Sequence, residues 1–438
     1  MREKIFFILM LVCISVNAQR ASVRTEKAGT LSKVLTDYQK KNLVSLKISG
    51  PINGTDIRLL QCMLSQKNTP DSLKGKLKQL DLESARIVSG GEAISKIDNT
   101  PLFLPYAVFS NFEEDISTED DIMGYEIFKE CQLESIILPN TLKKISDKAF
   151  SDNKNLSYIK IPKSVIQIGW SIFQNCPCLV SINVDVDSNS FVSADGILFS
   201  KDRKRLVNYP CGKIGDYVIP DGTEHIYGAF VGCKFIASIT IPESVKDEIK
   251  DNNETFGGCK FKTVYIQGAI EGAKFIPCTE KYIVNEDNQE YSTIDGVLYD
   301  KAKKTLLRYP PSCQATSTYN TEIIGYKAFC DCNFLTSIRI DPPTKKIGQC
   351  AFLRCRNLQT IKIPSTVTEI YKDAFLGCNN LSHLYFESSI PPVHHDLWNP
   401  KSEAKPFKIY NSKCVLHVPK GSKDSYQKLW PNHTIVEE

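Results

Sequence analysis

The 438-residue chain is poor in the residues that most often carry out chemistry. It contains only 6 histidines, 4 methionines and 3 tryptophans. None of the motifs Gly-x-Ser-x-Gly, His-Glu-x-x-His, Gly-x-Gly-x-x-Gly or P-loop occurs. We therefore expect no enzyme, no cofactor and no metal site.

The chain also lacks strong charge and long apolar runs. Its formal net charge of +4 does not indicate a nucleic-acid partner. After residue 18 no apolar stretch reaches the ~20 residues that cross a bilayer, so we expect no transmembrane segment in the mature chain.

The first 18 residues have the layout of a secretory signal peptide. Arg2 and Lys4 precede an apolar core over residues 5–16, which is too short to span a membrane. Residues 16–18 read Val-Asn-Ala, which predicts cleavage before Gln19. We expect an exported protein, extracellular or at the cell surface, although an uncleaved anchor remains an alternative.

Cysteine is the abundant exception, with 16 residues. Seven of them follow a phenylalanine by three positions and so mark a repeat, and in an eighth copy Asn153 follows Phe150. These phenylalanines are Phe128, Phe173, Phe230, Phe256, Phe329, Phe352 and Phe375. The usual spacing is 23 residues, interrupted twice. A buried thiol is a small apolar filler with a weak donor, so we expect a structural column in which the Asn amide can replace it.

Each repeat carries the pattern of one solenoid coil. An Ile-x-Ile strand ends at Pro, a Val-x-x-Ile segment returns, and Ala-Phe-x-x-Cys forms a turn. One unit cannot bury its own apolar face, so stacked units share a core. The predicted fold is α/β and β-rich, a solenoid of ~23-residue coils with a parallel sheet.

The remaining segments predict two inserts and two end regions. Residues 183–210 and 283–310 align at an offset of 100, and their Asp-Gly pairs predict two β-meanders. Residues 19–121 form a predicted N-terminal α/β cap, 122–390 the solenoid and 391–438 the C-terminal cap. Within the first cap we expect one helix over 29–41, a helix from Asp56 to Leu64, and a loop over 90–121. The loop carries an acidic cluster of Glu113, Glu114, Asp115, Glu119, Asp120 and Asp121.

These patterns together resemble the BspA-type leucine-rich repeat proteins. The segments that carry the resemblance are residues 50–57, 80–82, 161–165, 374–378 and 418–422. The resemblance implies a leucine-rich repeat solenoid from an exported or surface-displayed protein of the Bacteroides group. It also implies that some members bind host matrix proteins or other cells, and it supplies no catalytic residues.

The outward positions of the predicted strands are the candidate binding residues. Aromatic and arginine side chains are enriched at binding hot spots. The candidates are Tyr158, Lys160, Tyr265, Arg339, Lys362, His383 and Tyr385. An ordinary solvated sheet face is the alternative explanation for them.

Three functions follow from these observations. The first is a non-enzymatic protein-binding or adhesion module, with a host matrix or cell-surface protein as a possible partner. The second is a glycan-binding surface protein for nutrient capture. The third, a hydrolase with an unrecognised site, has the least support because no motif indicates it.

Overall fold

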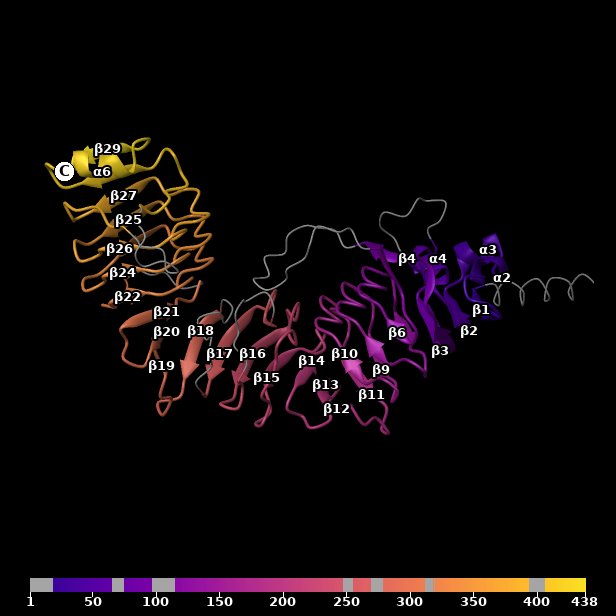
Figure 1. The fold of residues 1–438 in the computed structure, drawn as a ribbon. Helices are drawn as coiled ribbons and strands as arrows, with labels where there is room; N and C mark the ends of the chain where they lie inside the picture. Colours follow the sequence, from indigo (N-terminus) through magenta and orange to yellow (C-terminus); the bar gives the residue numbers. More distant parts are fainter. Residues whose placement is uncertain are drawn as a thin grey trace, which may run out of the picture. The chain divides into compact units, whose positions relative to one another are not determined.

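The computed structural model describes residues 19–64, 75–96, 115–246, 255–268, 279–311, 318, 320–393 and 406–438. The predicted signal peptide therefore lies outside the described residues. The chain divides into two compact units (Figure 1). The first unit comprises Met1–Ile214, Gly222–Phe235 and Asn253–Cys259, and the second comprises Gly215–Asp221, Ile236–Asn252 and Lys260–Glu438.

A parallel sheet with one strand per coil runs through the first unit. Its strands, in spatial order, are β1 (Arg20–Arg24), β2 (Ser45–Ile52), β3 (Gln79–Ile87), β7 (Ser135–Ile137), β9 (Tyr158–Ile161) and β11 (Ser181–Val184). The register places Ile136 beside Ile159 and Ile159 beside Ile182. All three are buried, because alternate residues of a strand point to the same face.

Short return strands form a second parallel sheet on the other side of the same coils. They are β6 (Ile122–Met123), β8 (Lys144–Ile145) and β10 (Gln167–Ile168). Ile145 and Ile168 are paired across this sheet and buried. The two sheets therefore enclose one apolar core, which no single coil could bury alone.

The turn of each coil contains the predicted phenylalanine column. The ring of Phe150 stacks on Phe128 at 6.1 Å and on Phe173 at 5.7 Å between centroids. The residues two before and two after the phenylalanine have left-handed backbone, as at Lys148 (φ 54°) and Asp152 (φ 63°). Such conformations reverse the chain tightly at a cost to non-glycine residues, so the stacked core stabilises a strained turn.

The N-terminal helix prediction is wrong over residues 29–41. Two short helices, α2 (Leu31–Val34) and α3 (Asp37–Asn42), replace one, with Leu35 extended between them. The side chain of Thr36 accepts from the Gln39 amide at 3.2 Å and starts α3 with a capping box. This cap is what breaks the apolar periodicity and leaves Tyr38 exposed.

Asp56 lies in the first turn of α4 (Gly54–Leu64) and joins this helix to its surroundings. Its buried carboxylate accepts from the backbone amides of Gly29 at 2.6 Å and Leu31 at 2.8 Å. It also accepts from the Asn53 amide at 3.1 Å. The residue therefore caps α2 from a distance as well as the start of its own helix.

The predicted loop over 90–121 is also wrong in part. Strands β4 (Gly90–Lys96) and β5 (Asp115–Thr118) pair antiparallel. Of the predicted acidic cluster, Glu113 and Glu114 lie outside the described residues. Asp121 forms an ion pair with Arg86 at 3.4 Å, so this carboxylate has a cationic partner within the protein.

Each insert is a three-stranded antiparallel meander. Their strands are β12 (Phe191–Ala194), β13 (Ile197–Ser200) and β14 (Leu206–Asn208), and then β19 (Tyr291–Ile294), β20 (Val297–Asp300) and β21 (Thr305–Arg308). Asp195 and Gly196 both have positive φ, as a type I′ hairpin turn requires. The ring of Tyr209 packs on Phe230 in a tilted arrangement at 5.5 Å between centroids, so the tyrosine after the meander occupies the phenylalanine column.

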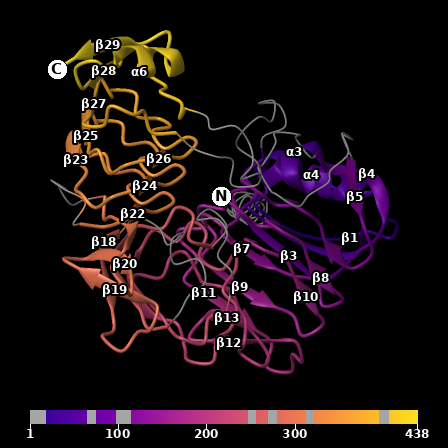
Figure 2. The ribbon, with the colours of Figure 1, turned by 60° about the vertical axis from the view of Figure 1, so that its left-hand side comes forward.

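The second unit has two parallel sheets of the same kind. One contains β15 (Gly215–Val218), β16 (Ile236–Ile241), β17 (Phe261–Ile266) and β18 (Thr279–Val284). The other contains β23 (Ser337–Arg339), β25 (Thr360–Ile363), β27 (His383–Phe386), β28 (Val415–Val418) and β29 (Thr434–Glu437). Return strands β22 (Ile323–Ile324), β24 (Lys346–Ile347) and β26 (Glu369–Ile370) extend the second meander through β21. Figure 2 shows these coils stacked one above another.

The last coil is covered by α6 (Lys423–Leu429) and β29. Trp430 directly follows this helix, packs on Phe407 at 5.0 Å and donates its indole N–H to the Phe407 carbonyl at 3.1 Å. The ring of Tyr426 is buried against Phe386. These aromatic rings close the core of the second unit, and the predicted α/β, β-rich solenoid is confirmed.

Candidate functional site

One row of side chains crosses the last sheet of the second unit. The strand register places Arg339 beside Lys362, Lys362 beside Tyr385, and Tyr385 beside His417. Residues paired in this way point to the same face of the sheet. We call the four residues Arg339, Lys362, Tyr385 and His417 the basic–aromatic row. Because the alternate residues of these strands are buried, the row belongs to the outer face.

The centre of the basic–aromatic row is a stacked pair. The rings of Tyr385 and His417 lie 4.1 Å apart at 13°. The ammonium group of Lys362 lies 5.8 Å from the centroid of the Tyr385 ring, within the range of a cation–π contact. These contacts hold three side chains in fixed positions, which lowers the entropy cost of binding a partner there.

His383 lies on the strand beside that of His417, diagonally across from this histidine. Its Nδ1 lies 3.0 Å from Nε2 of His417, whose Nδ1 lies 2.6 Å from Oε1 of Glu438. The carboxylate can only accept, so His417 donates through Nδ1. When the His417 ring is neutral, its Nε2 carries a lone pair and accepts from Nδ1 of His383.

A shallow hollow of about 280 Å³ lies beside the row. It is lined by Lys362, Tyr385, Phe386, Glu387, His417, Val418, Pro419 and Glu438. A volume of this size admits one or two side chains or a small group. It therefore fits an anchor residue of a larger partner better than a whole drug-sized ligand.

The other sequence-predicted residues do not join this cluster. Tyr158 and Lys160 lie on β9 of the first unit, and Lys160 forms an ion pair with Asp185 at 2.9 Å. Tyr265 is exposed on β17, in the other parallel sheet of the second unit. The predicted residues therefore belong to three different sheets, and Arg339, Lys362, His383 and Tyr385 share one of them.

Sequence reasoning missed His417 and Glu438. The signal for His417 is present, because Leu416-His417-Val418-Pro419 repeats the apolar-x-apolar-Pro pattern and places the histidine at an outward position. Glu438 carries no such signal, since it follows the last strand and belongs to no repeat. It contacts His417 because β29 pairs with β28 in the folded chain.

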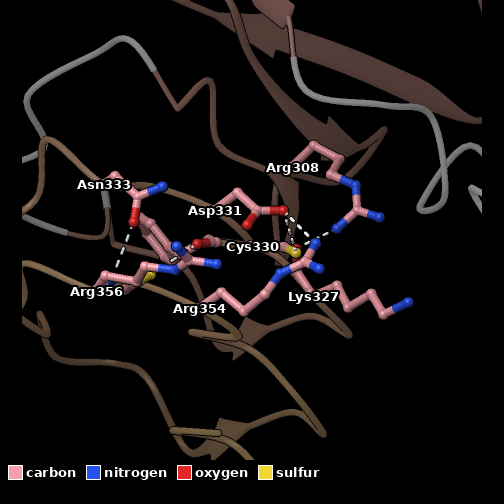
Figure 3. A network of polar contacts seen from close by, with 9 residues as sticks. Arg308, Lys327, Cys330, Asp331, Asn333, Arg354 and Arg356 are labelled. Atoms are coloured by element: carbon pink, nitrogen blue, oxygen red, sulfur yellow. Dashed lines mark hydrogen bonds and ion pairs between the residues drawn. The ribbon is translucent and has the colours of Figure 1, made fainter. Parts of the chain in front are cut away.

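A second polar network ties neighbouring coils together (Figure 3). Arg354 donates to the Asp331 carboxylate at 2.6 Å, one repeat away, and this hydrogen bond raises the pKa of the guanidinium. Asn333 accepts from the Arg356 amide at 3.1 Å. The partners in these two contacts are 23 residues apart in sequence, so we assign the contacts to coil stacking.

The cysteines of the column serve the same structural purpose. The thiols of Cys176 and Cys378 donate to the carbonyls of Phe150 and Phe352 at 3.2 and 3.0 Å. Cys211, which sequence reasoning left outside the column, also belongs to it, with its sulfur 3.8 Å from the Phe173 carbonyl oxygen. Sequence reasoning missed Cys211 because it comes after the meander. There the cysteine follows the aromatic residue, Tyr209, by two positions and not by three.

The described residues contain no group of three or more His, Cys, Asp or Glu side chains that could hold a metal ion. The His394–His395–Asp396 sequence lies outside the part of the chain that the structure describes. None of the described helices is both long and apolar enough to cross a bilayer.

Comparisons with known proteins identify the repeat. The family described as BspA type leucine rich repeat region matches in six copies over residues 121–203, 205–280 and 314–413. No curated protein matches the chain.

Solved structures include similar chains at low identity. A leucine rich cell surface protein from Faecalibacterium prausnitzii is 21 % identical, with 68 % of this chain and 83 % of that chain covered and a TM-score of 0.38. A leucine-rich repeat protein from Bacteroides ovatus is 18 % identical, with coverages of 91 % and 84 % and a TM-score of 0.34. The pneumococcal vaccine antigen PcpA is 15 % identical, with coverages of 90 % and 79 % and a TM-score of 0.30.

Proposed function

Because the chain belongs to the BspA-type leucine-rich repeat family, we propose that it is a non-enzymatic protein-binding module, exported and extracellular or at the cell surface. The observation that carries the proposal is the stacked pair of Tyr385 and His417 beside Lys362 on an outer sheet face. Solenoid sheets provide extended surfaces for binding. Tyrosine and arginine are enriched among residues that dominate binding energy.

The charge of the row indicates the chemistry of the partner. Arg339 and Lys362 are adjacent cations, and the side chain of Arg339 is 67 % exposed, with an ion-pair contact to Asp341 at 3.9 Å. A contact this long leaves the guanidinium accessible to another carboxylate. We therefore expect an acidic segment of a host matrix or cell-surface protein, with an apolar or aromatic residue in the adjoining hollow.

Binding of residues 19–438 to arrays of immobilised matrix proteins and glycans tests this proposal. The variant R339A/K362A/Y385A should lose binding to its matrix-protein partner by at least about tenfold, since several hot-spot residues are removed. The matched control is Y158A/K160A on the other unit, which should bind as the wild type does. Unchanged binding by the triple variant would remove the row from the site.

A second candidate function rests on a different surface of the first unit. Trp170 is 50 % exposed, and its ring meets Tyr227 edge-on at 5.3 Å. An exposed aromatic corner of this kind presents apolar faces on which sugar rings can stack. If W170A abolishes glycan binding on the array while R339A/K362A/Y385A retains it, the glycan-binding alternative replaces our first choice.

A further inference from the structure

The two imidazoles beside the basic–aromatic row have the spacing of a metal-binding pair. We propose that His383 and His417 bind a nitrogen-preferring divalent transition ion, such as Cu²⁺, Ni²⁺ or Zn²⁺. The inference concerns the surface already proposed for partner binding, but it needs no partner. Its basis is the 3.0 Å separation between Nδ1 of His383 and Nε2 of His417.

The nitrogen separation matches two adjacent positions around one metal ion. Metal–nitrogen bonds of about 2.0–2.1 Å and a separation of 3.0 Å give a nitrogen–metal–nitrogen angle of about 90°. Tetragonal Cu²⁺ and Ni²⁺ sites use angles of this size, whereas tetrahedral Zn²⁺ needs a wider one. We therefore expect Cu²⁺ and Ni²⁺ to bind more tightly than Zn²⁺, in keeping with the general order of divalent affinities.

When both imidazole rings are neutral, the metal binds without net release of a proton. Glu438 accepts from Nδ1 of His417, which leaves Nε2 as the nitrogen of the neutral ring that faces the site. His383 must move its proton from Nδ1 to Nε2, through water, to expose its own lone pair. Both rings stay neutral, as metal ligation requires, and two nitrogen–metal bonds replace one hydrogen bond.

The surroundings hold the ligands in place. Metal-bound histidines usually donate their second nitrogen to a carboxylate, which fixes the ring and raises its basicity. Glu438 occupies that position relative to His417 at 2.6 Å. The stack with Tyr385 at 4.1 Å restrains the same ring from its face, so His417 is prepared for ligation in the absence of the ion.

The chain supplies only two ligands within its described residues, so water or a partner side chain completes the coordination. This geometry defines an open surface site. On a surface that already carries the basic–aromatic row, a metal with free positions would add a strong anchor for a partner's histidine or carboxylate.

The direct test is titration of the untagged chain, residues 19–438, with Cu²⁺ and Ni²⁺ by calorimetry, together with electron paramagnetic resonance of the copper form. We expect one site with two nitrogen ligands. H383A and H417Q should each weaken binding by about tenfold or more, and E438Q by several-fold, as outer-shell changes do. The variant H394A/H395A removes the other adjacent histidine pair and should bind as the wild type does.

Two outcomes would overturn the site: unchanged affinity in H417Q, or loss of binding in H394A/H395A. Thermal unfolding of each variant without metal establishes that the chain still folds. Partner binding is measured separately with a chelator present. Failure of metal binding then leaves the protein-binding proposal standing, and failure of partner binding leaves the metal site standing.

Discussion

The thiol of Cys355 lies 2.9 Å from the carbonyl oxygen of Phe329, in the preceding coil. The same carbonyl oxygen accepts from the backbone amide of Cys332 at 3.2 Å, so the thiol of Cys355 donates to the second lone pair of that oxygen. In the one copy without cysteine, Nδ2 of Asn153 donates to the equivalent carbonyl of Phe128 at 2.7 Å. A donor that reaches the previous coil, and not sulfur chemistry, is therefore what this position requires.

Replacing Cys355 tests that requirement. The variant C355A removes the donor and some buried volume, so we expect the second unit to lose about 1–2 kcal/mol in its free energy of unfolding. The variant C355N restores a donor of the kind found at Asn153 and should lose less. Urea unfolding followed by circular dichroism measures both. If C355N is the less stable of the two, the column is held by packing alone.

The reactivity of the thiols should separate the column from the remaining cysteines. Burial raises the pKa of Cys131 to about 12 and that of Cys414 to about 12, and it raises the pKa of Cys176 and Cys259 further. A thiol with a raised pKa carries almost no reactive thiolate at pH 8. Cys178 is exposed.

We therefore expect iodoacetamide at pH 8 to modify Cys178 rapidly and the column thiols only after denaturation. Peptide mass spectrometry at a series of times gives the rate at each cysteine, and C178S removes the fast site as a control. Rapid labelling of Cys355 or Cys378 in the native chain would contradict the buried column.

The phenylalanine column should carry much of the stability of the second unit. Phe352 is fully buried and stacks on Phe329 at 4.9 Å and Phe375 at 5.6 Å. Truncation of a buried phenylalanine to alanine costs about 3–5 kcal/mol, so F352A should melt well below the wild type. The control is F334A, because Phe334 is 66 % exposed. Equal melting temperatures for the two variants would show that the ring stack contributes little.

The sequence predicts what repeats and misses what occurs once. The Ile, Phe and Cys columns follow from spacing, because each position has the same neighbours in every coil. The break at Thr36 depends on one capping box, which the apolar periodicity of residues 31–38 conceals. Tyr209 and Tyr309 enter the ring column because β14 and β21 continue into the return strands.

The candidate site divides in the same way. The repeat pattern predicts Lys362, His383 and Tyr385 as candidate binding residues because they occupy outward positions of repeated strands. Their contact with His417 and Glu438 depends on the register of β28 and β29, beyond the last full repeat. The sequence cannot show that Lys160 is paired with Asp185 or that Tyr265 lies in another sheet, because both facts depend on where each parallel sheet ends.

The stability of the C-terminal cap should fall as the solution becomes mildly acidic. Burial lowers the pKa of His433 below its ordinary value of 6.5, and its Nε2 is shielded from water without a hydrogen-bond partner. The unfolded chain therefore binds a proton near pH 6.5 that the folded chain does not take up, so the free energy of unfolding decreases as the pH drops through this value.

Hydrogen exchange of α6 and β29 at pH 7.5, 6.5 and 5.5 measures the effect, after correction for the intrinsic exchange rate. H433Q cannot take up the proton, and we expect a flatter dependence over this window. The same slope in H433Q and the wild type would assign the pH dependence to other groups.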